Sequence, residues 1–210
     1  MNLRDTFRNQ ILWSVGFLLI LTSATYAGDK LPGEYRLIEE PEIHTNGKVV
    51  LLEFADFYCP HCHMFDNQVG STLKKEFGDR LEIQMIGFPV MRGKLPTAFE
   101  MYEQAKAMGK GPEMKVVLFR SIHQDKIHIF DRSLRSPLIR EVGLNVKDFE
   151  AGMATGDPYK ALEHGKKWGE RIGVTHTPTI ILNGNIRVDN IGIENLRTLI
   201  KGILKQDKAG

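Results

Sequence analysis

The stretch from Val49 to Cys62 most constrains what this chain can fold into. Residues 49–55 are apolar apart from Glu53, and such a run is typical of a strand covered on both faces of a sheet. Beyond Cys62 an apolar residue recurs at every fourth position, as on one face of a helix: Phe65, Val69, Leu73 and Phe77. The sequence therefore predicts that Cys59-Pro60-His61-Cys62 lies where a buried strand ends and a helix begins.

The predicted position of Cys59 favours a reactive sulfur. At a helix start the unpaired backbone N–H groups and the positive end of the macrodipole favour an anion. A thiolate placed there is stabilised, which makes a cysteine reactive near neutral pH. We therefore expect Cys59 to be the nucleophile, and Cys62, one turn further in, to be the resolving thiol of an exchange that passes through a mixed disulfide.

These two cysteines are the only ones among the 210 residues. A disulfide between Cys59 and Cys62 would close a very short loop, and short loops contribute little to stability. The pair is therefore predicted to form a redox-active disulfide rather than a structural one.

The N-terminal region predicts export. Arg4 and Arg8 precede an apolar stretch over residues 11–21, and Thr25-Tyr26-Ala27 is a plausible cleavage point, so residues 1–27 are interpreted as a secretory signal peptide. The apolar stretch is short for a membrane span, although an uncleaved anchor is the alternative. We expect a periplasmic protein, with residues 28–210 as one domain.

The formal net charge of +2 and the dispersed basic residues do not indicate a nucleic-acid surface.

The order of predicted elements indicates an α/β fold. A helix between the strands at 49–55 and 81–88 makes those strands parallel. The remaining elements are a short strand near 35–38, several helices over about 96–172, a hairpin with Asn183-Gly184 at its turn, and a final helix with one apolar face. This order predicts a thioredoxin-like fold, with a helical subdomain inserted at about residues 92–172.

Two motifs now support a family resemblance. Cys59-Pro60-His61-Cys62 follows Leu52-Glu53-Phe54, and Val-Thr-His-Thr-Pro-Thr stands at residues 174–179. Together they resemble the DsbA family of exported thiol–disulfide oxidoreductases, over essentially the whole mature chain. One departure concerns Thr177, because strongly oxidising DsbA proteins usually have valine before the proline, and threonine is more typical of isomerase-type relatives.

The resemblance implies partners and a direction of reaction. The substrates would be unfolded or newly exported cysteine-containing proteins, and a quinone-linked membrane protein would re-oxidise the enzyme. No cofactor and no metal are expected, and the protein is expected to be a monomer. Disulfide formation is the favoured direction, with isomerase or reductase activity as the alternative.

The resemblance also assigns roles to further residues. His61 would stabilise the Cys59 thiolate. Glu53 would be a buried acid, its pKa raised by desolvation, that moves protons to and from Cys62. A cis peptide bond before Pro178 would leave the backbone of Thr177 free to pair with an extended substrate. His176 is expected either to line the same groove or to lie on a surface loop.

Other readings of the cysteine motif stay open at this point. Cys59 to His63 also matches C-x-x-C-H, the attachment motif of c-type haem, which would make the protein an electron carrier. A zinc site on Cys59, Cys62 and His63 lacks an obvious fourth ligand. A non-enzymatic chaperone that holds unfolded chains would not need Cys59 at all.

Overall fold

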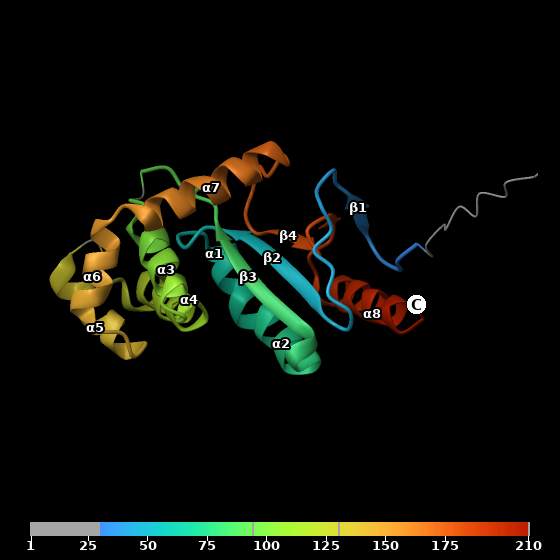
Figure 1. The fold of residues 1–210 in the computed structure, drawn as a ribbon, viewed down its shortest axis with the longest axis horizontal. Coiled ribbons are helices and arrows are strands. Elements are labelled where there is room, and N and C mark those ends of the chain that lie inside the picture. The colour runs from blue at the N-terminus through green and yellow to red at the C-terminus, as the bar shows by residue number, and fades with distance from the viewer. Residues whose placement is uncertain (1–29, 94, 130, 210) are drawn as a thin grey trace, which may run out of the picture. The chain divides into compact units, whose positions relative to one another are not determined.

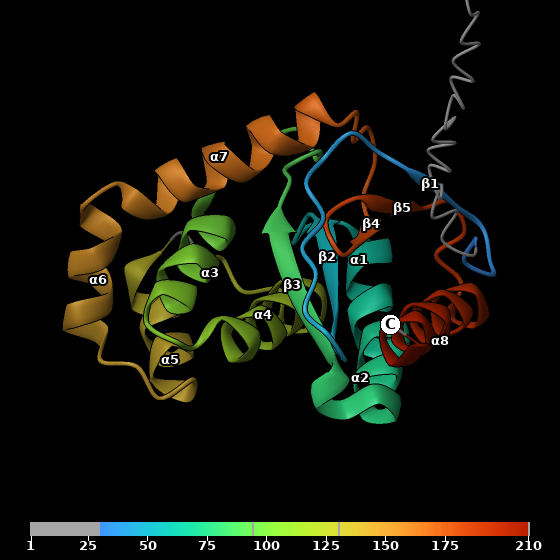
Figure 2. The same ribbon diagram turned by 45° about the vertical axis from the view of Figure 1, so that its right-hand side comes forward.

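The fold is known from a computed structural model, which describes residues 30–93, 95–129 and 131–209. The predicted signal peptide, residues 1–27, lies outside the described residues. From residue 31 onward the chain forms one compact unit, shown in Figures 1 and 2.

A five-stranded mixed sheet forms the centre of this unit. The strands are β1 (Tyr35–Leu37), β2 (Val49–Ala55), β3 (Leu81–Gly87), β4 (Thr179–Leu182) and β5 (Ile186–Val188), in the order β1-β5-β4-β2-β3. The pair β2–β3 is parallel, and the other pairs are antiparallel. All seven residues of β2 are buried, as its unbroken apolar run predicts.

The connection from β2 to β3 carries the cysteine motif. It consists of α1 (Pro60–Met64), a π-helical segment (Phe65–Gly70), α2 (Ser71–Phe77) and a 3-10 turn (Gly78–Arg80). A π-helix has more residues per turn than an α-helix, so it keeps side chains spaced by four on one face. Phe65, Leu73 and Phe77 are accordingly buried.

Each face of β2 packs against a different set of helices, because successive side chains of a strand point to opposite faces. Val49 and Leu51 belong to a core with the π-helical segment, α2 and α8 (Ile193–Ala209). Val50, Leu52 and Phe54 belong to a core that includes the C-terminal part of α7 (Asp157–Arg171). By this alternation Glu53 points to the face covered by the π-helical segment, α2 and α8.

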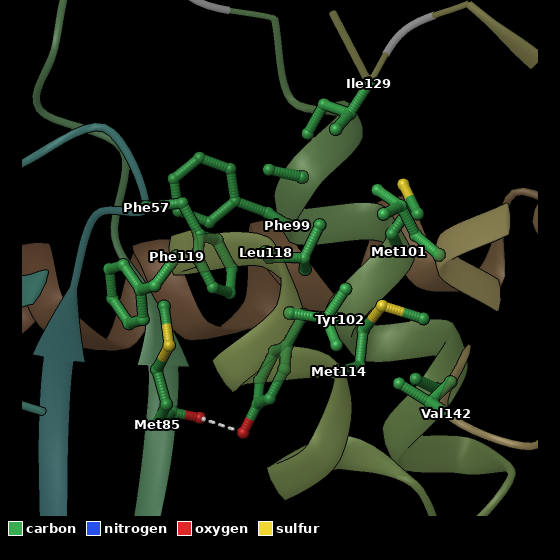
Figure 3. Packing of buried hydrophobic residues seen from close by; sticks show 14 of the residues in the cluster. Phe57, Met85, Phe99, Met101, Tyr102, Met114, Leu118, Phe119, Ile129 and Val142 are labelled. Carbon is green, nitrogen blue, oxygen red and sulfur yellow. Dashed lines mark hydrogen bonds between the residues drawn. The ribbon is translucent and has the colours of Figure 1, made fainter. Parts of the chain in front are cut away.

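All remaining helices lie between β3 and β4 in the sequence. They are α3 (Thr97–Ala107), α4 (Gly111–Arg120) with a π-helical continuation (Ser121–Asp125), α5 (Arg132–Glu141), α6 (Val146–Ala154) and α7. Figure 3 shows their core, in which Phe57 packs edge to face against Phe99 and Tyr102 and lies tilted against Phe119. The Tyr102 hydroxyl donates a hydrogen bond to the Met85 carbonyl on β3, at 3.2 Å.

The helices reach the sheet through close backbone approach. A Cβ atom added at Gly169 of α7 would lie 2.5 Å from the ring of Phe88, so only glycine allows this contact. Cys59 and Cys62 belong to the same buried cluster as Phe57 and Phe99. The cysteine motif therefore lies where the sheet and the helices meet.

Candidate active site

Cys59 occupies the N-cap position of α1, directly after the turn that follows β2. Its backbone is extended, with φ −84° and ψ 118°. Its N–H donates to the Asp56 carbonyl at 3.0 Å, and its own carbonyl accepts from the His63 N–H at 3.2 Å. The Cys59 side chain retains 7% exposure, whereas Cys62 inside the helix has none. Both cysteines are free thiols in this structure, so the Cys59–Cys62 disulfide stays a prediction.

Asp56 fixes the turn before Cys59, a role that the sequence reasoning missed. One carboxylate oxygen accepts from the Tyr58 N–H at 2.8 Å. The other accepts from the N–H groups of Val90 and Met91, at 2.8 and 2.9 Å. The signal was available, because an aspartate that ends a strand commonly bonds the backbone two residues later.

The second segment of the site comes from the distant end of the sheet. Thr179 on β4 pairs with Phe54 on β2, which brings Thr177 and Pro178 beside the cysteines. The Thr177–Pro178 peptide bond is cis. The Sγ atom of Cys59 donates to the Thr177 carbonyl at 3.6 Å. Sheet pairing thus joins two segments that are 118 residues apart in sequence.

Burial dominates the chemistry of Cys62. Desolvation raises the pKa of its thiol well above the ordinary cysteine value, and the nearby Cys59 and Glu53 raise it further. Hydrogen bonding from the Asp56 backbone opposes only part of this effect. Cys62 is therefore held as a neutral thiol unless a neighbouring group takes its proton.

Glu53 lies beneath the cysteines as a fully buried carboxyl group. Neither of its oxygens has a hydrogen-bond partner among the described residues. Desolvation raises the pKa of Glu53 to about 7; Lys115 lowers it and Asp66 raises it. Lys115 and Asp66 form an ion pair of 2.5 Å with each other, so the positive charge of Lys115 is shared with Asp66 and does not serve Glu53 only.

His61 and His176 line one cavity together with Thr177 and Pro178. The cavity has a volume of about 400 Å³ and also contains Arg36 and Arg187. Both histidines are exposed, so their rings are available to a ligand in the cavity. His176 is exposed outside the helices and strands and also lines this cavity, so its role in binding stays a prediction.

His63 packs against a histidine that sequence reasoning did not single out. The rings of His63 and His123 stack at a centroid distance of 4.6 Å and an interplanar angle of 5°. His63 Nε2 lies 2.7 Å from Asn67 Nδ2, and His123 Nε2 lies 2.8 Å from the Phe57 carbonyl. Burial lowers the pKa of His123. No local motif could have found His123, because it lies far from the cysteines in sequence.

Comparison with known proteins identifies the family of this site. A family model described as thioredoxin matches residues 44–202. The chain belongs to the thioredoxin family.

Relatives refine this assignment to the DsbA group. DsbA of Yersinia pestis, a thiol:disulfide interchange protein, is 23% identical over 193 residues, which is 89% of each chain. Among solved structures, a variant of Pseudomonas aeruginosa DsbA has a TM-score of 0.66 at 19% identity and covers 86% of this chain and 99% of its own. A putative protein disulfide isomerase from Nitrosomonas europaea has a TM-score of 0.65 at 15% identity, covering 76% and 98%. The predicted DsbA-family thiol–disulfide oxidoreductase and its thioredoxin-like fold are confirmed.

In this DsbA-family enzyme the two cysteines have different surroundings. Cys59 faces the open side with the Thr177 carbonyl, and Cys62 faces the interior with Glu53.

Within the described residues, no helix combines the length and apolar character that a membrane span requires.

Proposed function

We propose that the protein is an exported oxidase that introduces disulfides into newly translocated proteins. A substrate thiolate attacks the Cys59 sulfur of the oxidised pair, the Cys59–Cys62 bond breaks, and Cys62 leaves. A second substrate thiolate then attacks the substrate sulfur of the mixed disulfide and releases Cys59 as a thiolate. Two substrate thiols are oxidised and the cysteine pair is reduced.

The observation that carries this proposal is the unequal burial of the two cysteines. Cys59 retains 7% exposure and its sulfur lies against the Thr177 carbonyl, whereas Cys62 has no exposed surface. An incoming thiolate can therefore reach Cys59 and not Cys62. Cys62 lies in the first turn of the helix that Cys59 caps, so it stays close enough to resolve a mixed disulfide on Cys59.

Glu53 is proposed to carry the proton of Cys62. The Cys62 thiolate is unfavourable in its buried site, so it must be protonated as it leaves. A carboxyl group with a pKa of about 7 exchanges protons efficiently at neutral pH. Because Glu53 has no hydrogen-bond partner among the described residues, its proton is not committed elsewhere. During re-oxidation Glu53 would take the proton back.

The rim residues are proposed to bind the substrate and stabilise the reactive thiolate. The Thr177 backbone N–H has no hydrogen-bond partner among the described residues, which suits pairing with an extended chain. Pro178 and His176 line the cavity beside it. His61, in the first turn of α1, is proposed to stabilise the Cys59 thiolate with its ring N–H or its positive charge.

Export, partners and assembly complete the proposal. The N-terminal motif over residues 1–27 and the DsbA names of the relatives support a periplasmic location. A membrane redox protein would re-oxidise the cysteine pair, and the enzyme would act as a monomer. Isomerase activity is the second candidate, supported by Thr177 before the proline and by the Nitrosomonas structure titled a putative disulfide isomerase.

The redox potential of the cysteine pair tests the direction of the reaction. An oxidase should have a potential well above the roughly −270 mV of thioredoxin and nearer the roughly −120 mV of DsbA. It can be measured by equilibrating the mature enzyme with glutathione buffers. A potential near that of thioredoxin would overturn the oxidase direction. A Cys59→Ala variant that retained full activity would instead support a chaperone without redox chemistry.

A further inference from the structure

The cavity beside Thr177 has an unusual charge arrangement. Arg36 on β1 and Arg187 on β5 stand directly opposite each other in the antiparallel register. Opposed residues of this kind share one face of the sheet, and like charges there are destabilising. Burial lowers the pKa of Arg187, and the neighbouring positive charge of Arg36 lowers it further, while Asp189 acts in the opposite direction. Both arginines line the cavity that contains Thr177.

One carboxylate offsets these two arginines. Asp189 forms an ion pair with Arg36, and it is the only acidic residue among those that line the cavity. His61 and His176 add positive charge whenever they are protonated. The cavity lining therefore carries an excess of at least one positive charge.

Arg187 also has unused hydrogen-bonding capacity. It is only 7% exposed, and its Nη1 donates to the carbonyls of Ile172 and Gly173 at 3.0 and 3.1 Å. No described residue accepts from its Nε or Nη2. A carboxylate is the natural partner for free guanidinium N–H groups, since it accepts two parallel hydrogen bonds.

We propose that this cavity, defined by Arg36, Arg187, His61, His176 and Thr177, binds an acidic side chain of the substrate polypeptide. The inference rests on the proposed attack at Cys59, but not on the direction of the reaction. The substrate backbone would pair with Thr177, and a glutamate or aspartate close to the reacting cysteine would reach the arginines. The enzyme then prefers cysteines that have an acidic neighbour.

Matched peptides test this preference. Two single-cysteine peptides, identical except for glutamate or glutamine on both sides of the cysteine, react with the oxidised mature enzyme under stopped flow. The ratio of the two rate constants is then compared between enzyme variants, which cancels the intrinsic difference between the two thiols. We expect Arg36→Gln to lower the glutamate preference about three- to tenfold, and added salt to lower it similarly.

Two further variants determine the sign and the location of the effect. Asp189→Asn removes the competing carboxylate and should increase the glutamate preference. Lys126 lines a second cavity, together with Tyr58 and Ile122. Lys126→Gln removes a positive charge there and should leave the glutamate preference unchanged. Arg187→Gln should act like Arg36→Gln, although it also loses two bonds to carbonyls, so its melting temperature must be checked.

The outcomes separate this inference from the proposed function. A ratio that is the same in wild type, Arg36→Gln and Asp189→Asn, while both peptides react, overturns the acidic-substrate inference and leaves the exchange chemistry standing. An equal loss in Lys126→Gln also overturns it, because the effect would then be one of net charge. No reaction with either peptide overturns the proposed attack at Cys59, and the inference with it.

Discussion

The two sulfurs of the motif lie on the same short helix but in opposite surroundings. Cys59 at the N-cap is partly open and contacts the Thr177 carbonyl. Cys62 has no exposed surface, and its pKa is raised mainly by burial. In the proposed function this difference divides the motif, with substrate recognition on the open side and proton transfer on the buried side.

The open side is itself divided. The cavity with Arg36 and Arg187 is charged, whereas a second cavity of about 430 Å³ is lined mainly by apolar side chains of Tyr58, Leu95, Ile122, Ile127 and Ile129. Apolar contact is not directional and accepts many sequences, whereas a guanidinium selects a carboxylate. The second cavity thus suits general binding of unfolded chains, and the first suits discrimination.

The largest expected effect comes from exchanging each sulfur for oxygen. Cys62→Ser should abolish disulfide formation, because the Cys59–Cys62 bond can no longer form. The Cys59 thiolate can still attack a disulfide in a substrate, and the mixed disulfide should then accumulate because Cys62 is not there to resolve it. Cys59→Ser should abolish activity without accumulating such complexes, because Cys62 is enclosed. Non-reducing gels with mass spectrometry measure both. Equal trapping of substrate on Cys62 would break the comparison between the two sulfurs.

Removing the Glu53 carboxyl should have the next largest effect. Glu53→Gln should slow disulfide exchange at neutral pH by about 100-fold, the lower range for loss of an acid–base group. Rates measured from pH 5 to 9 should also lose the inflection near pH 7 that Glu53 contributes. Glu82, an exposed acid on β3, provides the control. Glu82→Gln should keep the inflection near pH 7, which assigns this inflection to Glu53.

The same substitution should raise stability at neutral and alkaline pH. The pKa of Glu53 is raised from 4.5 to about 7, so the folded state binds more protons than the unfolded state between these values. Stability is therefore lost as pH rises through this window, up to about 3 kcal/mol above pH 7. Urea denaturation at pH 5 and pH 8 should show this slope in the wild type and a flatter one in Glu53→Gln. An equal slope in both proteins would mean that the pKa of Glu53 is the same in the folded and unfolded states.

A smaller effect should follow from the apolar cavity. Leu95 is 53% exposed, so Leu95→Ser should leave the fold intact while reducing the apolar surface offered to a substrate. We expect about a fivefold lower rate with an unfolded protein substrate, and no change with a small dithiol. Leu37→Ser is the matched control, because Leu37 is 68% exposed and lines neither cavity described above. Similar losses in both variants would argue against the apolar cavity as a binding site.

The junction of β2 and α1 could be predicted from the sequence. The unbroken apolar run ends at Ala55, and the four-residue spacing of apolar side chains begins at Phe65. Local signals were less reliable inside the helical region. A proline after a serine, as at Ser136-Pro137, is typical of a helix start. However, α5 begins at Arg132, because Asp131 caps it by accepting from the Ser133 N–H at 2.8 Å. Pro137 lies inside that helix.

What could not be predicted depends on contacts between distant segments. The resemblance suggested a buried Glu53, but the Lys115–Asp66 ion pair that modulates it joins α4 to the π-helical segment. The opposition of Arg36 and Arg187 requires the register of β1 on β5, and the two residues are far apart in the chain. Periodicity reports which face of an element is buried, and it carries no information on what that face meets.

The smallest expected effect concerns His123, on the helical side of the motif. Its pKa is lowered, first by burial and then by the positive charges of His63 and Lys126, while its bond to the Phe57 carbonyl and the charge of Asp56 act in the opposite direction. The unfolded state therefore binds more protons than the folded state below the ordinary value of 6.5, and stability falls as pH decreases through that value.

His123→Gln keeps a side-chain N–H for the Phe57 carbonyl but cannot be protonated. Its melting temperature should decrease less than that of wild type between pH 7 and pH 5. The comparison is best made in the Glu53→Gln background, because Glu53 gives a slope of the opposite sign over the same range. An equal decrease of the melting temperature in both proteins would show that His123 accepts a proton in the folded state without cost, and that its burial does not penalise the charged ring.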